Sequence, residues 1–196
     1  MSETIQTHPR PQRPRRNGPP PRRSHAPRAA LAPVKQKSEI PDDAVKFVPL
    51  GGFEEIGRNC SFFEYKNQIV VIDVGIQFPE ENTPGVDYII PNVTHLEQKK
   101  GNIQGIILTH GHYDHIAAIH YLIEKLGNPI IYASPFTRAI VEKRHEDFPN
   151  APKLRFINVE AGKRVKISED FTAEFVEVEH TIPEALGFIL ETPVGN

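Results

Sequence analysis

Short apolar runs separated by turn residues begin at Lys46 and continue to the end of the chain. The runs KFVPLGG, NCSFFEY and QIVVIDVG predict three successive strands, with turns at Gly51-Gly52 and Lys66-Asn67. After a loop rich in Pro, Gly and Asn (PEENTPGVDYIIPN), the run NIQGIILTH predicts a fourth strand of the buried type. The folded part of the chain therefore opens with β-structure.

Two predicted helices follow the fourth strand. The stretch DHIAAIHYLIEKLG places apolar residues along one helical face and ends in Gly127, which predicts a helix with Asp114 suited to its N-cap. The stretch SPFTRAIVEKRHEDF predicts a second helix, with Ser134 as its N-cap and Pro135 in the first position. Strands are predicted at NPIIYA, between the helices, and at RFINV, RVKI, FTAEFVEVEH and GFILET. This order favours an α/β layered fold with a mixed sheet.

Composition separates a basic arm from this domain. Residues 1–38 carry nine Arg and Lys against one acid, Glu3, and hold eight of the 19 prolines. The other 158 residues carry 14 basic and 24 acidic side chains, a net charge of −10. Because the basic segment has no apolar periodicity, we expect residues 1–45 to be a disordered Pro/Arg-rich arm and residues 46–196 to be the domain.

Several cellular locations are excluded by what the sequence lacks. No apolar segment follows the basic residues as it would in a secretory signal, and no run reaches the length of a membrane span. The single cysteine, Cys60, excludes an internal disulfide and fits a reducing compartment. We therefore expect a cytoplasmic protein that has no membrane partner.

The stretch LTHGHYDHIAAIHYL carries the candidate chemistry. His110 and His112 follow a buried strand two positions apart, so both imidazoles can face one point. Asp114 and His115 come at the start of the next helix, and ligands from a strand end and a helix start converge at the mouth of an α/β sheet. Histidine and carboxylate suit Zn²⁺ or Mn²⁺, and two neighbouring ligand pairs suit two ions.

The alternative is a polar loop that is rich in histidine, with Asp114 only capping a helix. Chance would produce the pattern HxHxDH in roughly one in a thousand chains of this composition, which favours the metal site. Among the other histidines of the domain, we interpret His120 as structural and both His95 and His145 as solvated.

The motif HGHYDH resembles the signature of the metallo-β-lactamase fold. The histidine at its last position, His115, makes the motif similar to that of the two-metal hydrolases of this fold. Four further stretches are similar, in order and spacing, to the amino-terminal part of the ribonuclease J family and its β-CASP relatives: LGGFEEIGRN (50–59), VIDVGIQFP (71–79), PGVDYIIPN (84–92) and EHTIPEALG (179–187). The resemblance covers about residues 46–196. It implies a metallo-β-lactamase αββα sandwich of which only the amino-terminal part is present.

The resemblance also implies roles for individual residues. It implies these metal ligands: His110, His112 and His180 for one divalent ion, and Asp114 and His115 for a second. The ions are expected to be zinc, with manganese as the alternative, and Asp114 is expected to serve catalysis as well. Asp73, at the end of QIVVID, is expected to orient a ligand or help position the ions. The alternative for Asp73 is that it caps a turn beside Gly75.

The sequence departs from the family in a few places. Ala117-Ala118 replace glycines of many relatives, which favours helix, and Glu184 stands where Asp is frequent. In the family, the aspartate that bridges both metals and the β-CASP domain would follow residue 196. We therefore expect this chain alone to bind at most one metal tightly and to be inactive on RNA.

Three functions are compared. The leading hypothesis is a cytoplasmic metal-dependent ribonuclease that cuts RNA internally, degrades it from the 5′ end, or does both, and that is a homo-oligomer at full length. In this hypothesis the active site and the Arg-rich arm both bind RNA, the arm without sequence preference. The alternatives are a hydrolase of the same fold that acts on a lactam, thioester or lactone, and a non-catalytic RNA-binding module.

Overall fold

The computed structural model describes Pro41 and residues 43–80 and 83–196. The chain divides into two units, residues 1–38 and residues 39–196. Most of the predicted arm therefore lies outside the described residues. Of its last positions, Val45 packs against a cluster of buried apolar side chains in the second unit.

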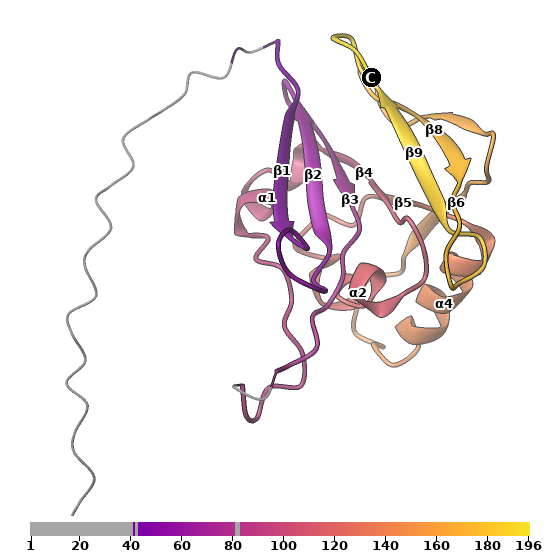
Figure 1. The fold of residues 1–196 in the computed structure, drawn as a ribbon. Helices are drawn as coiled ribbons and strands as arrows, with labels where there is room; N and C mark the ends of the chain where they lie inside the picture. Colours follow the sequence, from indigo (N-terminus) through magenta and orange to yellow (C-terminus); the bar gives the residue numbers. More distant parts are fainter. Residues whose placement is uncertain (1–40, 42, 81–82) are drawn as a thin grey trace, which may run out of the picture. The chain divides into compact units, whose positions relative to one another are not determined.

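The larger of two sheets has six strands that lie side by side in the order of the chain (Figure 1). They are β1 (Lys46–Gly51), β2 (Cys60–Tyr65), β3 (Gln68–Ile72), β4 (Ile103–Ile107), β5 (Ile130–Ala133) and β6 (Arg155–Asn158). The first three strands pair antiparallel, and β3 to β6 pair parallel. The predicted mixed sheet is confirmed.

A smaller sheet holds the last three strands in antiparallel pairing. They are β7 (Arg164–Lys166), β8 (Thr172–Glu177) and β9 (Leu186–Glu191). All nine strands predicted from the apolar runs are thus present in the described part of the chain. Their ends lie within a few residues of the predicted ones.

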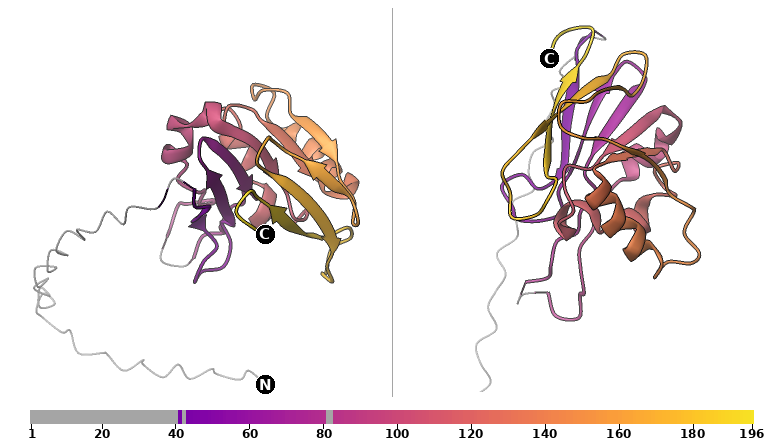
Figure 2. Two further views of the ribbon diagram at one scale, coloured as in Figure 1. Left: turned by 90° about the horizontal axis from the view of Figure 1, so that it is seen from above. Right: turned by 90° about the vertical axis from the view of Figure 1, so that its right-hand side faces the viewer.

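The two sheets and the helices form three layers. Alternate side chains of β3 point to opposite faces of the large sheet: Ile69 and Val71 join the cluster that packs on the helices, and Val70 and Ile72 join the cluster that faces the small sheet. Figure 2 shows the small sheet on one side of the large sheet and the helices on the other. Burial on both faces explains why the central strands are continuously apolar.

The helices are short, with one exception. They are α1 (Thr94–Gln98), the 3₁₀ helix η1 (Lys100–Asn102), α2 (Tyr113–Ile116), α3 (Ile119–Leu122) and α4 (Pro135–His145). In α4, Pro135 is in the first turn and Ser134 is the N-cap, whose side chain accepts a hydrogen bond from the Thr137 N–H, as predicted. No helix within the described ranges is long and apolar enough to cross a membrane.

The single helix predicted after His112 is wrong, because the chain forms the two short helices α2 and α3 instead. Ala118 N–H donates to Val74 O at 3.0 Å and not to the carbonyl of Asp114, one helical turn back. That carbonyl accepts from Asn59 N–H at 3.0 Å. Segments distant in sequence therefore take the hydrogen bonds that a continuous helix needs, which overrides the helical preference of Ala117-Ala118.

The predicted N-cap of this region is wrong for the same reason. His112 is the N-cap of α2, with no side-chain cap bond, and Asp114 lies inside the first turn. The Asp114 carboxylate is thereby left free for other contacts.

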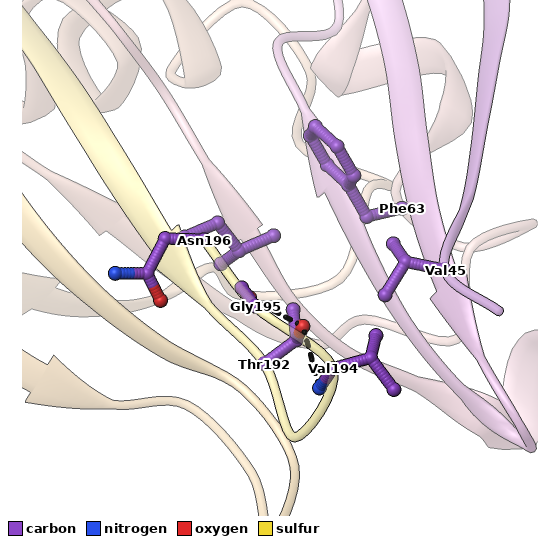
Figure 3. A pocket seen from close by; sticks show the side chains of 7 residues that line it. Val45, Phe63, Thr192, Val194, Gly195 and Asn196 are labelled. Carbon is purple, nitrogen blue, oxygen red and sulfur yellow. Dashed lines mark hydrogen bonds between the residues drawn. The ribbon is translucent and has the colours of Figure 1, made fainter. Parts of the chain in front are cut away.

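A cavity of about 250 Å³ lies where β1 begins and β9 ends (Figure 3). Its lining residues are Val45, Phe63, Leu190, Thr192, Val194, Gly195 and Asn196. None of their side chains offers a carboxylate, imidazole or thiol. His110 and His112 follow the carboxyl end of β4, at the end of the large sheet away from this cavity. The cavity is therefore not part of the histidine site.

Candidate metal centre

Strand ends bring the predicted site residues to one edge of the large sheet. Asp73 follows β3, and His110 follows the neighbouring parallel strand β4. His180 follows β8 of the small sheet, where Leu186 N–H donates to Thr109 O at 2.9 Å and ties the start of β9 to the loop after β4. The carboxyl ends of parallel strands in α/β proteins are the usual place for such sites.

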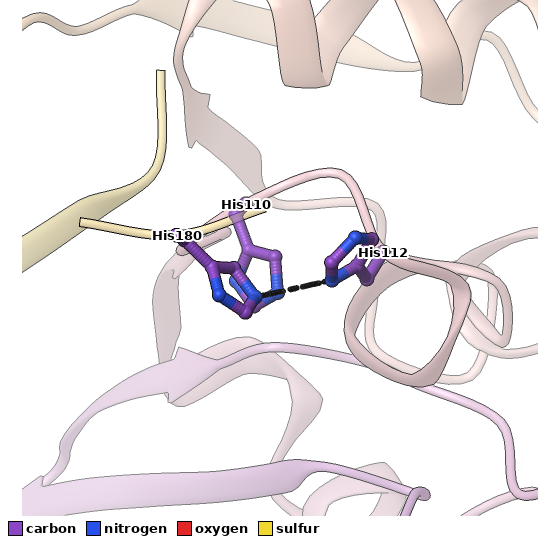
Figure 4. A group of neighbouring side chains, drawn as sticks. All are labelled: His110, His112 and His180. Carbon is purple, nitrogen blue, oxygen red and sulfur yellow. Dashed lines mark hydrogen bonds between the residues drawn. The ribbon is translucent and has the colours of Figure 1, made fainter. Parts of the chain in front are cut away.

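The three histidines assigned to one ion lie together (Figure 4). His180 Nε2 is 3.1 Å from His110 Nε2 and 3.1 Å from His112 Nδ1, and the last two atoms are 3.2 Å apart. His110 is buried, whereas His180 is exposed. The site is thus closed on one side and open to solvent on the other.

These three nitrogen atoms fit a tetrahedral metal ion. Ligands held at about 2.0–2.1 Å from zinc in tetrahedral geometry lie roughly 3.3 Å from one another, close to the separations found here. A metal ion binds the unprotonated nitrogen of each ring, and three such lone pairs directed at one point are unfavourable without a cation between them. The arrangement therefore suits a cation with a further position open toward solvent.

Thr109, whose role the sequence did not reveal, orients His110. Its Oγ1 lies 3.0 Å from His110 Nδ1 and 2.9 Å from Asp73 Oδ2. A hydroxyl that donates to the carboxylate can accept from the imidazole, so these contacts favour the tautomer of His110 that has its proton on Nδ1 and its Nε2 lone pair toward the other histidines. The signal in the sequence was only a hydroxyl residue directly before the first histidine.

Protonation of His110 is disfavoured. Burial, followed by the charges of His115, His180 and His112, lowers the pKa of His110 from 6.5 to about 4. A neutral imidazole is the form that binds metal, so near neutral pH this ring is ready to act as a ligand.

Asp114 and His115, assigned to a second ion, lie beside the triad. The Asp114 Oδ2 and His115 Nε2 atoms are 3.5 Å apart, and the rings of His115 and His110 have centroids 4.1 Å apart. Within the described residues, the only group of three or more ligands that converge within 4.8 Å is the histidine triad. Asp114 and His115 therefore offer two candidate ligand atoms beside the triad in the described part of the chain.

Asp73 contacts the site and not its own turn. Its carboxylate is buried, accepts from Thr109 N–H at 2.8 Å, and lies 2.8 Å from His115 Nδ1. The backbone of Asp73 has φ 56°, a conformation that Asp tolerates better than most residues. Burial lowers the pKa of His115, but the hydrogen bond and charge of Asp73 and the charge of Asp114 outweigh it and raise that pKa above its ordinary value.

The remaining histidines lie outside the site. His120 is buried, as expected of a structural residue, and His95 is exposed, as predicted. The prediction that His145 is solvated is wrong. His145 is partly buried, with Nδ1 3.1 Å from His120 Nδ1 and Nε2 3.2 Å from Pro152 O, because the end of α4 packs over α3.

The fold and the histidine triad agree with a family comparison. Residues 54–193 match the family described as the metallo-beta-lactamase superfamily. The chain belongs to this superfamily. The match spans the large sheet from β2 onward, the histidine cluster and the small sheet.

Within the superfamily, the chain is similar to ribonuclease J of several bacteria. It is 38% identical to that of Corynebacterium glutamicum over 163 residues, which cover 83% of this chain and 22% of the relative. It is 36% identical to that of Thermus thermophilus over 163 residues, 80% of this chain and 28% of the relative. The chain thus spans about a quarter of the length of the relatives it matches.

Solved structures share the fold. A protein of unknown function from Enterococcus faecalis has a TM-score of 0.58 at 20% identity, over 76% of this chain and 41% of that one. The short form of human tRNase Z has a TM-score of 0.50 at 18% identity, over 76% of this chain and 64% of that one. At these identities the likeness concerns the fold alone.

Proposed function

We propose that the protein containing this chain is a metal-dependent hydrolase of RNA phosphodiesters, similar in activity to ribonuclease J. The observation that carries the proposal is the convergence of His110, His112 and His180 within 3.2 Å, in a chain 31–38% identical to several ribonuclease J proteins. The proposed action is 5′-to-3′ exonucleolytic, endonucleolytic or both.

In this proposal the two ligand groups hold two divalent ions, preferably zinc, with manganese as the alternative. When bound, such ions supply an activated water and stabilise charge on the phosphoryl oxygens. The histidine triad holds the first, and Asp114 with His115 holds the second. Asp114, whose side chain is 33% exposed, faces solvent where substrate would arrive, and we assign it the catalytic role. Asp73, whose side chain is 7% exposed, orients His115 from behind.

The proposal extends to partners and place of action. RNA is the proposed partner, at the metal site and along the basic arm, whose nine Arg and Lys side chains can contact phosphates. We also propose a cytoplasmic location and a homo-oligomeric full-length protein. The single cysteine, which fits a reducing compartment, supports the location.

The test uses the complete protein that contains this chain, loaded with Zn²⁺ or Mn²⁺, and a 5′-monophosphorylated RNA. We expect cleavage in the wild type, a loss of at least about 100-fold in His112→Ala, and no change in His95→Ala, an exposed histidine away from the site. Hydrolysis of a thioester, lactone or lactam without RNA cleavage would contradict the RNA substrate. RNA binding without turnover would contradict the enzyme.

A further inference from the structure

We propose that Asn59 is a positioning residue that holds Asp114 and His115 ready for a second divalent ion. The inference deepens the proposed function, because it rests on the assignment of these two side chains to that ion. Asn59 stands directly before β2 and is 55 residues from Asp114 in the sequence.

The Asn59 side chain touches the ligand atoms themselves. Its Nδ2 is 3.0 Å from Asp114 Oδ2, 3.1 Å from His115 Nε2 and 3.1 Å from Asp114 O. The carboxylate and carbonyl oxygens only accept hydrogen bonds, so the group that faces them must be the –NH₂. An amide nitrogen that donates is not a metal ligand, and Asn59 is therefore assigned to positioning.

The third acceptor is fixed by Asp73. Because the Asp73 carboxylate, 2.8 Å from His115 Nδ1, accepts the proton on that nitrogen, the neutral form of His115 presents its Nε2 lone pair to Asn59. Two N–H bonds of the amide thus serve three acceptors, two of which are the proposed ligand atoms. The same lone pairs would be given to the ion.

Without an ion, the two proposed ligand atoms repel each other, and the Asn59 amide reduces this repulsion. Asp114 Oδ2 and His115 Nε2 lie 3.5 Å apart, a separation suited to two ligands of one ion. A carboxylate and an imidazole lone pair directed at one point repel each other, and the donor between them compensates for this. When an ion takes the lone pairs, the amide keeps the Asp114 carbonyl as its acceptor, and little reordering is needed.

Main-chain hydrogen bonds, and not the Asn59 side chain, hold residue 59 against the loop that carries Asp114. The Asn59 main chain donates to Asp114 O at 3.0 Å and accepts from Gly75 N–H at 2.9 Å. A substitution of the side chain leaves both bonds in place. Asn59→Leu, of similar size, and Asn59→Ala therefore remove the amide donor selectively, and Asn150→Ala, at an exposed position, is the matched control.

The first measurement uses the complete protein that contains this chain, metal-free and with ¹⁵N-labelled histidine, at a pH above the raised pKa of His115, where that ring is neutral. A hydrogen bond to an imidazole lone pair moves the nitrogen resonance to lower frequency, so we expect His115 Nε2 to shift to higher frequency in both Asn59 variants. The His180 resonances and those of Asn150→Ala should stay as in the wild type. An unchanged His115 Nε2 resonance would overturn the inference without reference to any metal.

The second measurement is a Zn²⁺ titration of the same samples. The His180 signals report the triad, and the His115 signals report the second position. We expect the Zn²⁺ concentration at half-saturation of His115 to rise at least about tenfold in both Asn59 variants, because the two ligand atoms, without their common donor, move apart and must be brought together again when the ion binds. The half-saturation of His180 should stay within about twofold, which also shows that the variants are folded.

Two outcomes separate this inference from the proposed function. If zinc leaves the His115 signals of the wild type unchanged, both the second ion and the role of Asn59 are overturned, and the triad is not affected. If the zinc results are as expected but the complete protein cleaves no RNA, the ribonuclease proposal fails and the role of Asn59 is supported.

Discussion

At the scale of single residues, Asp73 joins the two ligand groups. Its carboxylate receives the Thr109 N–H, the Thr109 hydroxyl and the His115 ring. Through these contacts one buried side chain sets the orientation of His110 and His115. A substitution that removes the charge of Asp73 but keeps its shape should therefore disturb the orientation of both rings.

Asp73→Asn keeps a residue that tolerates φ 56° but leaves one acceptor oxygen for the groups that Asp73 now serves. With a chelator present, we expect the free energy of unfolding to fall by about 1–3 kcal/mol, the cost of a buried donor left without its partner. Urea denaturation measures it. Asp87→Asn, at an exposed position, is the control, and equal stabilities of the two variants would contradict the role of Asp73.

Two buried imidazoles make the metal-free protein sensitive to acid. Burial is the main cause that lowers the pKa of both His110 and His120 to about 4, and neighbouring histidines contribute. In the unfolded chain a histidine titrates near about 6.5. Between these values the unfolded state takes up protons that the folded state refuses, so stability falls as the pH drops from about 6.5 toward about 4.

His120→Phe keeps an apolar ring against Phe148 and removes one of the two groups. In a chelating buffer, we expect the melting temperature of this variant to fall less between pH 7 and pH 5 than that of the wild type, by roughly half of the decrease that His110 and His120 together cause. Differential scanning calorimetry at both pH values tests this. His95→Phe changes an exposed histidine and should follow the wild type.

At the scale of elements, the loop that carries the proposed metal ligands is held against the segment after β3. Val74 N–H donates to His115 O at 2.8 Å, and Ile76 N–H donates to Tyr113 O at 3.2 Å. Gly75 lies between them, where a Cβ atom would be 1.6 Å from Asp114 O. This close approach of two backbones places the ligands and leaves no room for a side chain.

Gly75→Ala should force the two segments apart. We expect a loss of about 3 kcal/mol or more in the free energy of unfolding, at the upper end for overpacking, because the obstacle is backbone that cannot rotate away. Chemical denaturation tests this. Gly101→Ala is the matched control, since a Cβ there meets no atom within 4 Å. Similar losses in both variants would contradict the close packing of residues 73–76 on the ligand loop.

At the scale of the whole molecule, charge is divided between the arm and the domain. Residues 1–38 have a net charge of +8, from nine basic and one acidic side chain, and the rest has −10. We expect deletion of residues 1–38 to weaken RNA binding and to reduce its dependence on salt. Each lost phosphate contact should lower the log–log slope by about 0.7 for single-stranded RNA, regardless of sequence. Binding isotherms at several salt concentrations measure the slope, and an unchanged slope would contradict a role of the arm in phosphate contacts.

The sequence by itself determined the strands, the helix α4 and the candidate ligands. The nine segments predicted as strands form strands of three to six residues, and Ser134-Pro135 begins a helix, because these signals act within a few residues. The spacing of His110 and His112 after a buried strand likewise predicted two neighbouring candidate ligands without knowledge of the fold.

Only the tertiary structure decided what depends on distant partners. Helix periodicity predicted one helix after His112, but Asn59 and Val74 take its hydrogen bonds from other parts of the chain. The contacts of Asn59, Thr109 and Asp73 with the ligands, and the approach of His180 over 70 positions of sequence, likewise arise from the packing of the two sheets. A local pattern cannot carry such information, because each of these hydrogen bonds exists only once the strands that end beside it have paired.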